Sequence, residues 1–192
     1  MGVDIFLGAI DEKKLFPKEY YQFGNTERRT HRLSRIFCNF MCRKESCPGI
    51  PELEQIGEIT GVDVKPIYEM ESNDGGDWGM DISTILSLFE TEKEKEMYLA
   101  QMKQRDEKMQ GNIDKVLKTI DALIDKLSQI DNLPQRLNHY GWDSIGYDEY
   151  FTEFNTDKGD LHPNFGQDLR NFKRFLEYAK DKGATTVYLS YG

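Results

Sequence analysis

The chain has 192 residues, of which 38% are hydrophobic, 31% are charged and 23 are aromatic. This aromatic content excludes a disordered chain, and the length is sufficient for a buried core without disulfides or a structural metal. The net charge of −9 argues against binding nucleic acid or an anionic membrane surface. No apolar run approaches the roughly 18 residues of a membrane span. The opening MGVDIFLGAID lacks the basic stretch of a signal peptide.

Three cysteines within ten residues do not form a disulfide framework, which favours a reducing compartment. We therefore expect one cytoplasmic domain comprising residues 1–192.

Two segments near the chain ends have strand patterns. In residues 3–10, Val3, Ile5 and Leu7 alternate with other side chains, and residues 185–191 are β-branched and aromatic. Two isolated strands are marginally stable, so we expect them to pair with each other against helices. The pairing would bring the two ends together.

Between these strands the sequence predicts mainly helix. A first helix is expected over residues 26–43, with a shorter one over 52–60 that Gly61 stops, and an extended piece over 62–68. The first helix has one apolar face, formed by Leu33, Ile36, Phe37, Phe40 and Met41. A C-terminal helix over 167–182 carries a second apolar face, formed by Leu169, Phe172, Phe175, Leu176 and Ala179.

Residues 91–131 show the strongest helical periodicity. Their apolar positions recur every three or four residues, and Gly111 marks either a kink or the corner of a helical hairpin. We expect this stripe to pack on the domain or on a second copy, since each buried side chain contributes roughly 1.5–3 kcal/mol. The predicted fold is therefore mainly α (α+β), with one long amphipathic helix or helical hairpin and a small terminal sheet. The stripe comprises Ile113, Val116, Leu117, Ile120, Leu123, Ile124, Leu127 and Ile130.

A cluster of basic residues is the clearest electrostatic anomaly. Residues 24–44 hold six basic side chains against Glu27 alone. On a continuous helix, Arg28, Arg32 and Arg35 would share one face, where guanidinium groups can bind phosphate or carboxylate. The alternative is that they pair with the chain's own acids.

Two sets of residues could hold a metal ion. His31, Cys38, Cys42 and Cys47 offer zinc-type ligands, but their spacing matches no standard zinc or iron–sulfur motif. The loop SNDGGDWGMD offers Asp74, Asp77 and Asp81, but lacks the distal glutamate of a calcium loop. We therefore predict no metal and no cofactor.

The aromatic and acidic segment 139–165 could supply general acid and base groups, with Asp143 and His162 as the candidates. We favour the interpretation that Trp142, Tyr147, Phe151 and Phe154 pack part of the core instead.

The sequence contains no phosphate-binding loop, dinucleotide fingerprint, nucleophile elbow or zinc-protease motif. Two functional hypotheses remain. The first is a non-enzymatic cytoplasmic protein that binds a protein partner, or a second copy, through the 91–131 helix. The alternative is a small enzyme or ligand-binding domain for an anionic molecule, with Arg28, Arg32 and Arg35 gripping the anion and Asp143 and His162 as acid and base.

Overall fold

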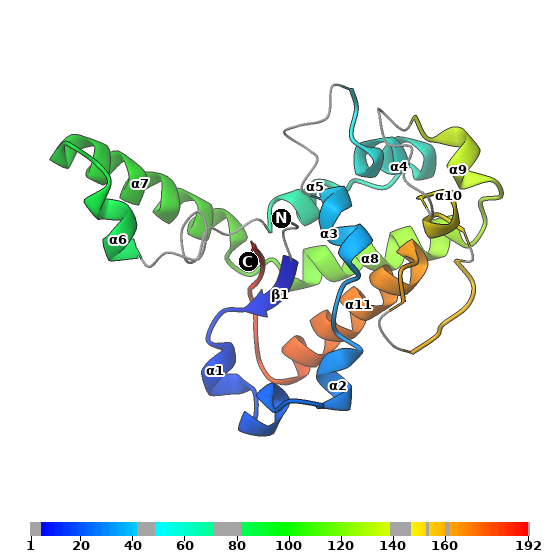
Figure 1. Cartoon of the computed structure of the whole chain (residues 1–192), viewed down its shortest axis with the longest axis horizontal. Helices are drawn as coiled ribbons and strands as arrows, with labels where there is room; N and C mark the ends of the chain where they lie inside the picture. The colour runs from blue at the N-terminus through cyan, green and yellow to red at the C-terminus, as the bar shows by residue number, and fades with distance from the viewer. Residues whose placement is uncertain are drawn as a thin grey trace.

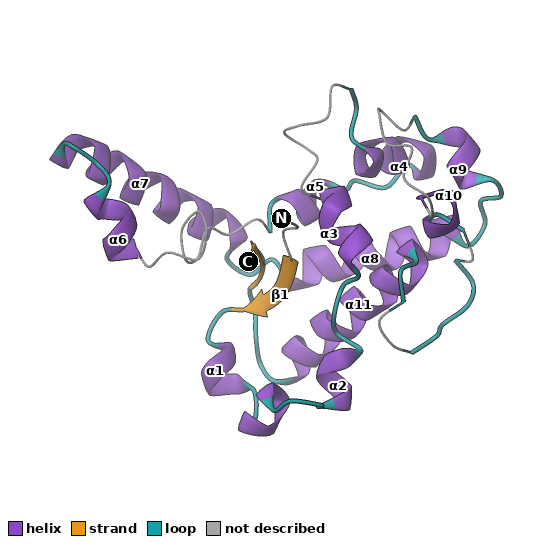
Figure 2. Cartoon of the chain, in the orientation of Figure 1, coloured by secondary structure: helices purple, strands orange, loops and turns teal. Residues whose placement is uncertain are grey.

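The computed structural model describes residues 5–41, 49–70, 82–138, 147–152, 154–159 and 162–191. It confirms a mainly α (α+β) fold in which a two-stranded sheet joins the N-terminal and C-terminal strands (Figures 1 and 2). In chain order the described elements are β1 (Ile5–Ala9), α1 (Glu12–Leu15), η1 (Lys18–Tyr21), α2 (Thr26–Arg29), α3 (Arg35–Met41), α4 (Glu52–Thr60), α5 (Lys65–Tyr68), α6 (Ile82–Ser87), α7 (Glu92–Met109), α8 (Ile113–Leu127), α9 (Leu133–Arg136), α10 (Tyr147–Tyr150), α11 (Phe165–Asp181) and β2 (Val187–Tyr191).

The sheet pairs β1 and β2 antiparallel, with Leu7 opposite Leu189. This confirms the predicted strands and their pairing. Asn112 covers the outer edge of β2, because its side chain accepts from the Val187 N–H and donates to the Val187 carbonyl, both at 2.9 Å. The Leu189 N–H donates to the Met70 carbonyl at 2.8 Å.

The core forms where α8 packs against α11 (Figure 1). Ile120 and Leu123 are completely buried, and α4 and α5 also contact α8. The predicted apolar stripe therefore packs on the protein itself. Its buried members are Ile113, Val116, Ile120, Leu123 and Leu127, while Leu117, Ile124 and Ile130 are partly buried.

The helix predicted over residues 26–43 is wrong as a continuous element. α2 ends at Arg29, where the Thr30 hydroxyl donates to the Glu27 carbonyl at 2.8 Å, and α3 begins only at Arg35. Ser34 precedes α3, and its hydroxyl accepts from the Phe37 N–H at 3.3 Å. Such a hydroxyl is typical of a helix start.

The segment 91–131 is broken at Gly111, whose φ of +71° suits glycine. The break separates α7 from α8, and the two helices diverge rather than lie side by side (Figure 1).

The extended piece predicted over 62–68 is also wrong in part. Residues 65–68 form α5, because the Asp63 carboxylate accepts from the Lys65 N–H at 3.0 Å and Pro66 suits a first turn.

Two of the four aromatic side chains, Phe151 and Phe154, pack into the core, as we favoured. Phe151 is completely buried and Phe154 is 8% exposed, and both rings contact Phe165 of α11. Trp142 and Asp143 lie outside the described residues.

Candidate functional site

The predicted arginine stripe does not form a single helix face. Arg28 lies on α2, Arg35 begins α3, and Arg32 lies in the segment between the two helices. All three side chains are exposed. The guanidinium of Arg28 lies 5.7 Å from the centre of the Tyr21 ring. Because residues 30–34 separate α2 from α3, the three arginines do not lie together on one helix.

The segment carrying Arg32 instead contacts a polar face of α11. The Asn171 side chain donates to the Arg32 carbonyl at 2.9 Å and accepts from Gln167 and Arg174, at 2.9 and 2.8 Å. Positions 167, 171 and 174 share one face of the helix because they are four and three residues apart.

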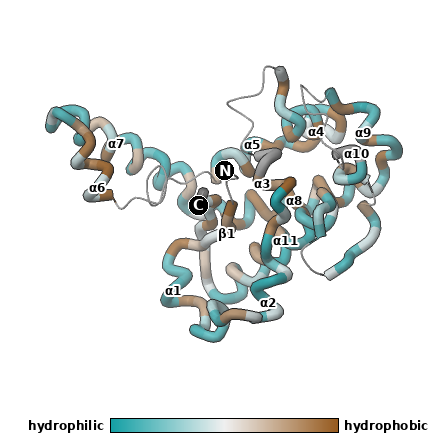
Figure 3. Tube along the Cα trace, viewed as in Figure 1, coloured by the Kyte–Doolittle hydropathy of each residue, from teal (hydrophilic) through white to brown (hydrophobic). Residues whose placement is uncertain are grey.

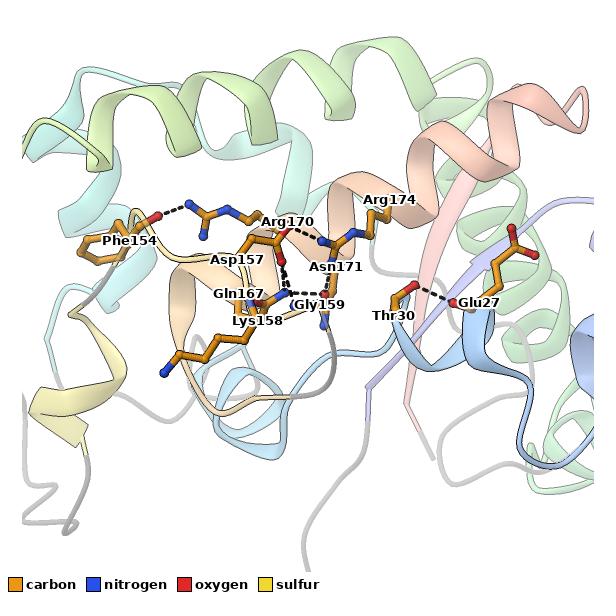
Figure 4. Close-up of polar contacts among 10 residues, drawn as sticks. All are labelled: Glu27, Thr30, Phe154, Asp157, Lys158, Gly159, Gln167, Arg170, Asn171 and Arg174. Carbon is orange, nitrogen blue, oxygen red and sulfur yellow. Dashed lines mark hydrogen bonds and ion pairs between the residues drawn. The ribbon is translucent and has the colours of Figure 1, made fainter.

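Asp157 connects this polar face to the loop before α11 (Figure 4). Its carboxylate pairs with Arg174 and accepts from the Gly159 N–H at 2.9 Å and from Gln167 at 3.2 Å. Burial opposes ionisation, but these hydrogen bonds outweigh it and hold the pKa of Asp157 below its ordinary value. The Arg174 guanidinium is therefore engaged within the protein.

Two further cationic side chains border the network. Arg170 donates through Nη2 to the Phe154 carbonyl, and burial lowers its pKa. Its Nη1 is buried without a hydrogen-bond partner among the described residues. His162, a predicted acid or base, lies with Nε2 3.2 Å from Nζ of Lys158. Since Asp143 is not described, the predicted pair of Asp143 and His162 remains a prediction.

A buried carboxylate with three hydrogen bonds was not predicted from the sequence. Asp168 is completely buried, and its two oxygens accept from the Ser34 N–H and the Ser34 hydroxyl, both at 2.6 Å. The Tyr150 hydroxyl donates to the same carboxylate at 2.9 Å. Burial raises the pKa of Asp168 to about 7, although the three hydrogen bonds oppose the rise. The available signal was an acid within the apolar stripe of the 167–182 helix, beside Leu169 and Phe172.

The candidate zinc ligands, which we did not expect to hold a metal, have other partners where they are described. His31 is buried, with Nδ1 3.0 Å from the Tyr20 hydroxyl. Cys38 is buried, and its sulfur accepts from the Ile5 N–H at 3.2 Å. No grouping of three or more His, Cys, Asp or Glu side chains suited to a metal occurs in the described ranges. The remaining candidate ligands, Cys42, Cys47, Asp74, Asp77 and Asp81, lie outside them.

Lowering the pH should destabilise the fold, because His31 is buried. Burial, together with Arg174, lowers its pKa to about 4, whereas the unfolded value is about 6.5. The unfolded chain thus binds more protons between these values, and stability falls as the pH drops from 6.5 to 4. Between pH 6.5 and pH 4, the free energy of unfolding of the parent should therefore fall by roughly 2–3 kcal/mol more than that of His31→Gln. Urea unfolding of both proteins at pH 4, 5.5 and 7 measures it; a constant difference between them would contradict the assignment.

The most exposed part of the described structure is a helical arm, residues 82–109, formed by α6 and α7. A capping box starts α7: the Thr91 hydroxyl accepts from the Glu94 N–H at 3.2 Å, and the Glu94 carboxylate accepts from the Thr91 N–H at 3.0 Å. Phe89, in the segment between the two helices, contacts Tyr98 of α7, with ring centres 5.3 Å apart. Figure 1 shows α7 extending away from the core.

Met109 is the one buried residue of α7, which has 18 residues. Much of α7 is hydrophilic, whereas α6 carries hydrophobic stretches (Figure 3). The described chain has nine large hydrophobic side chains that are exposed, and the arm carries four of them. These four are Ile82 (44% exposed), Leu88 (64%), Met97 (55%) and Leu99 (41%).

The described helices include none long and apolar enough to cross a membrane. Comparisons with protein-family models, curated proteins and solved structures give no match. The function must therefore be argued from the geometry of this chain.

Proposed function

We propose that this chain is a non-enzymatic, cytoplasmic interaction protein whose arm binds a protein partner. The observation that carries the proposal is that α7 extends from the core with one buried residue in 18. An isolated helix gains little from its own propensity, and most helical stability in proteins comes from tertiary packing. A partner that covers the arm would supply this packing.

The exposed apolar side chains support a contact surface on the arm. Scattered hydrophobic residues are normal on a surface, but a concentration of them marks an interaction site. Leu88 and Met97 are each more than half exposed. The capping box and the contact between Phe89 and Tyr98 fix the arm's shape before a partner arrives, which reduces the entropy lost on binding.

The alternative, a site for an anionic molecule, has less support. Arg28, Arg32 and Arg35 come from two short helices and the segment between them. The nearby guanidinium of Arg174 is already paired with Asp157.

Polar substitution of the arm should weaken partner binding without disrupting the fold. We expect the triple variant Leu88→Glu, Met97→Glu, Leu99→Glu to melt within a few degrees of the parent, since exposed substitutions usually change stability by less than about 0.5 kcal/mol. The measurement is quantitative co-purification from the source cells, followed by binding assays with the purified partner. We expect its affinity to fall at least roughly tenfold.

The matched control is Gln101→Glu, Gln104→Glu, Gln110→Glu, which adds the same charge at exposed positions of the arm and its end without removing apolar surface. The control should retain the partner. If the two triple variants lose or retain the same proteins, the apolar arm is not the contact surface.

A further inference from the structure

The turn after η1 presents an aromatic side chain on a backbone that hydrogen bonds of Asn25 hold. This Phe23 turn comprises residues 22–25, and the Phe23 side chain is fully exposed. Asn25 fastens both flanks of the turn: its Nδ2 donates to the Glu19 carbonyl at 3.0 Å, and its Oδ1 accepts from the Arg28 N–H at 2.7 Å. An exposed aromatic ring held in place by hydrogen bonds has the character of an interface anchor.

Basic residues flank this anchor along the chain. Tyr21 is 37% exposed, and the Arg28 guanidinium lies 5.7 Å from its ring centre. Residues 18–32 contain four basic and two acidic side chains, a net charge of +2 in a chain of −9. Aromatic rings and arginine are the side chains most enriched at interface hot spots. The Phe23 turn therefore suits an apolar cavity with an acidic rim.

The protein itself has such a cavity, between α4 and α5. This α4–α5 cavity is a hollow that is open to solvent, with a volume of about 370 Å³. Val64 and the Tyr68 ring supply its apolar lining. Of its three carboxylates, Glu69 is paired with Lys65 and Lys115, so Glu54 and Asp63 supply the acidic part of the rim. Figure 1 shows α4 and α5 on the opposite side of the core from α2, which follows the Phe23 turn. The lining residues are Glu54, Asp63, Val64, Lys65, Tyr68 and Glu69.

We propose that the Phe23 turn of one copy docks in the α4–α5 cavity of a second copy. The Phe23 ring enters between Val64 and Tyr68, and Arg28 meets the carboxylate rim. Because the two surfaces lie on opposite sides, each copy gives its turn to one neighbour and accepts a turn from another, so association proceeds head to tail. A membrane is a poorer occupant for the turn, because the net charge of −9 opposes an anionic surface.

The contact is small, so association is weak and depends on concentration. Sedimentation velocity from about 1 µM to about 500 µM covers the range in which such association appears. The weight-average sedimentation coefficient of the parent should rise with concentration. Phe23→Glu and Glu54→Lys should each weaken this association at least roughly tenfold. Ile10→Glu, at a side chain that is 44% exposed, and Asp125→Lys, at an exposed position of α8, are the matched controls, and both should associate like the parent.

Mixing the two variants tests the head-to-tail arrangement. The Phe23→Glu chain keeps its cavity and the Glu54→Lys chain keeps its turn, so an equimolar mixture should form pairs that do not grow. The proposal is overturned if the parent stays monomeric across the range, if either single variant associates like the parent, or if the mixture stays monomeric. Phe23-dependent binding of the monomer to phosphatidylserine vesicles would assign the turn to a membrane instead.

Discussion

Ile120→Asp should prevent cooperative folding. The Ile120 side chain is completely buried on α8, in the core that α8 forms with α11. An aspartate there loses the apolar contacts and places a carboxylate where no partner is available, so the expected loss exceeds about 4 kcal/mol. That is a large part of the roughly 5–15 kcal/mol by which domains are stable. Circular dichroism and urea unfolding measure the effect.

Two substitutions on α8 provide the controls. Ile120→Val removes one methylene group and should cost about 0.5–1.5 kcal/mol. Lys118→Asp introduces the same carboxylate at an exposed position and should change stability far less. A cooperative transition for Ile120→Asp near that of the parent would show that this face of α8 is not in the core.

The second large effect is expected at Asp168. Asp168→Leu removes the acceptor for the Ser34 N–H, the Ser34 hydroxyl and the Tyr150 hydroxyl, all of which are buried. Each buried donor left unsatisfied costs about 1–3 kcal/mol, so we expect a loss of roughly 3 kcal/mol or more. Asp168→Asn keeps the shape and an acceptor oxygen, and should cost much less. Urea unfolding at pH 7 compares the two variants, and equal losses would contradict the role of the hydrogen bonds.

The pH dependence at Asp168 has the opposite sign to that at His31. Its pKa is about 7 in the folded protein and near 3.8 when unfolded, so the folded state binds more protons between these values. Its contribution to stability is therefore full below pH 4 and is lost as the pH rises to 7. The stability of the parent relative to Asp168→Asn should fall over this range. Asp168 and His31 titrate in overlapping pH ranges, and their opposite effects on the free energy of unfolding partly cancel in the parent. Only the two single variants separate these effects.

The elements predicted correctly are those whose signals are local. The alternation in β1 and the three- and four-residue spacing in α8 specify the element without knowledge of distant residues. The same holds for α11, where the apolar stripe predicted both the helix and its buried face. Gly111 was identified as a break, but sequence alone left open whether α7 would fold back on α8.

The elements predicted wrongly depend on distant residues. Residues 26–43 have a helical apolar pattern, yet the chain breaks before Arg35 because Ser34 hydrogen-bonds to Asp168, 134 positions away. That one long-range contact also divides the predicted arginine stripe. A local pattern contains no information about such a partner, and tertiary contacts override helix propensity.

Backbone groups on the outer sides of β1 and β2 are hydrogen-bonded within the chain, which limits how the sheets of two copies can join. A two-stranded sheet normally presents two rows of backbone groups to which a strand of another molecule can add, and this is a common route to aggregation. On the outer side of β2, the Asn112 side chain accepts from the Val187 N–H and the Met70 carbonyl accepts from the Leu189 N–H. On the outer side of β1, Cys38 and Glu12 accept from the N–H groups of Ile5 and Ala9. An incoming strand would have to displace these partners before its first hydrogen bonds formed. The fold thus disfavours fibril growth by strand addition.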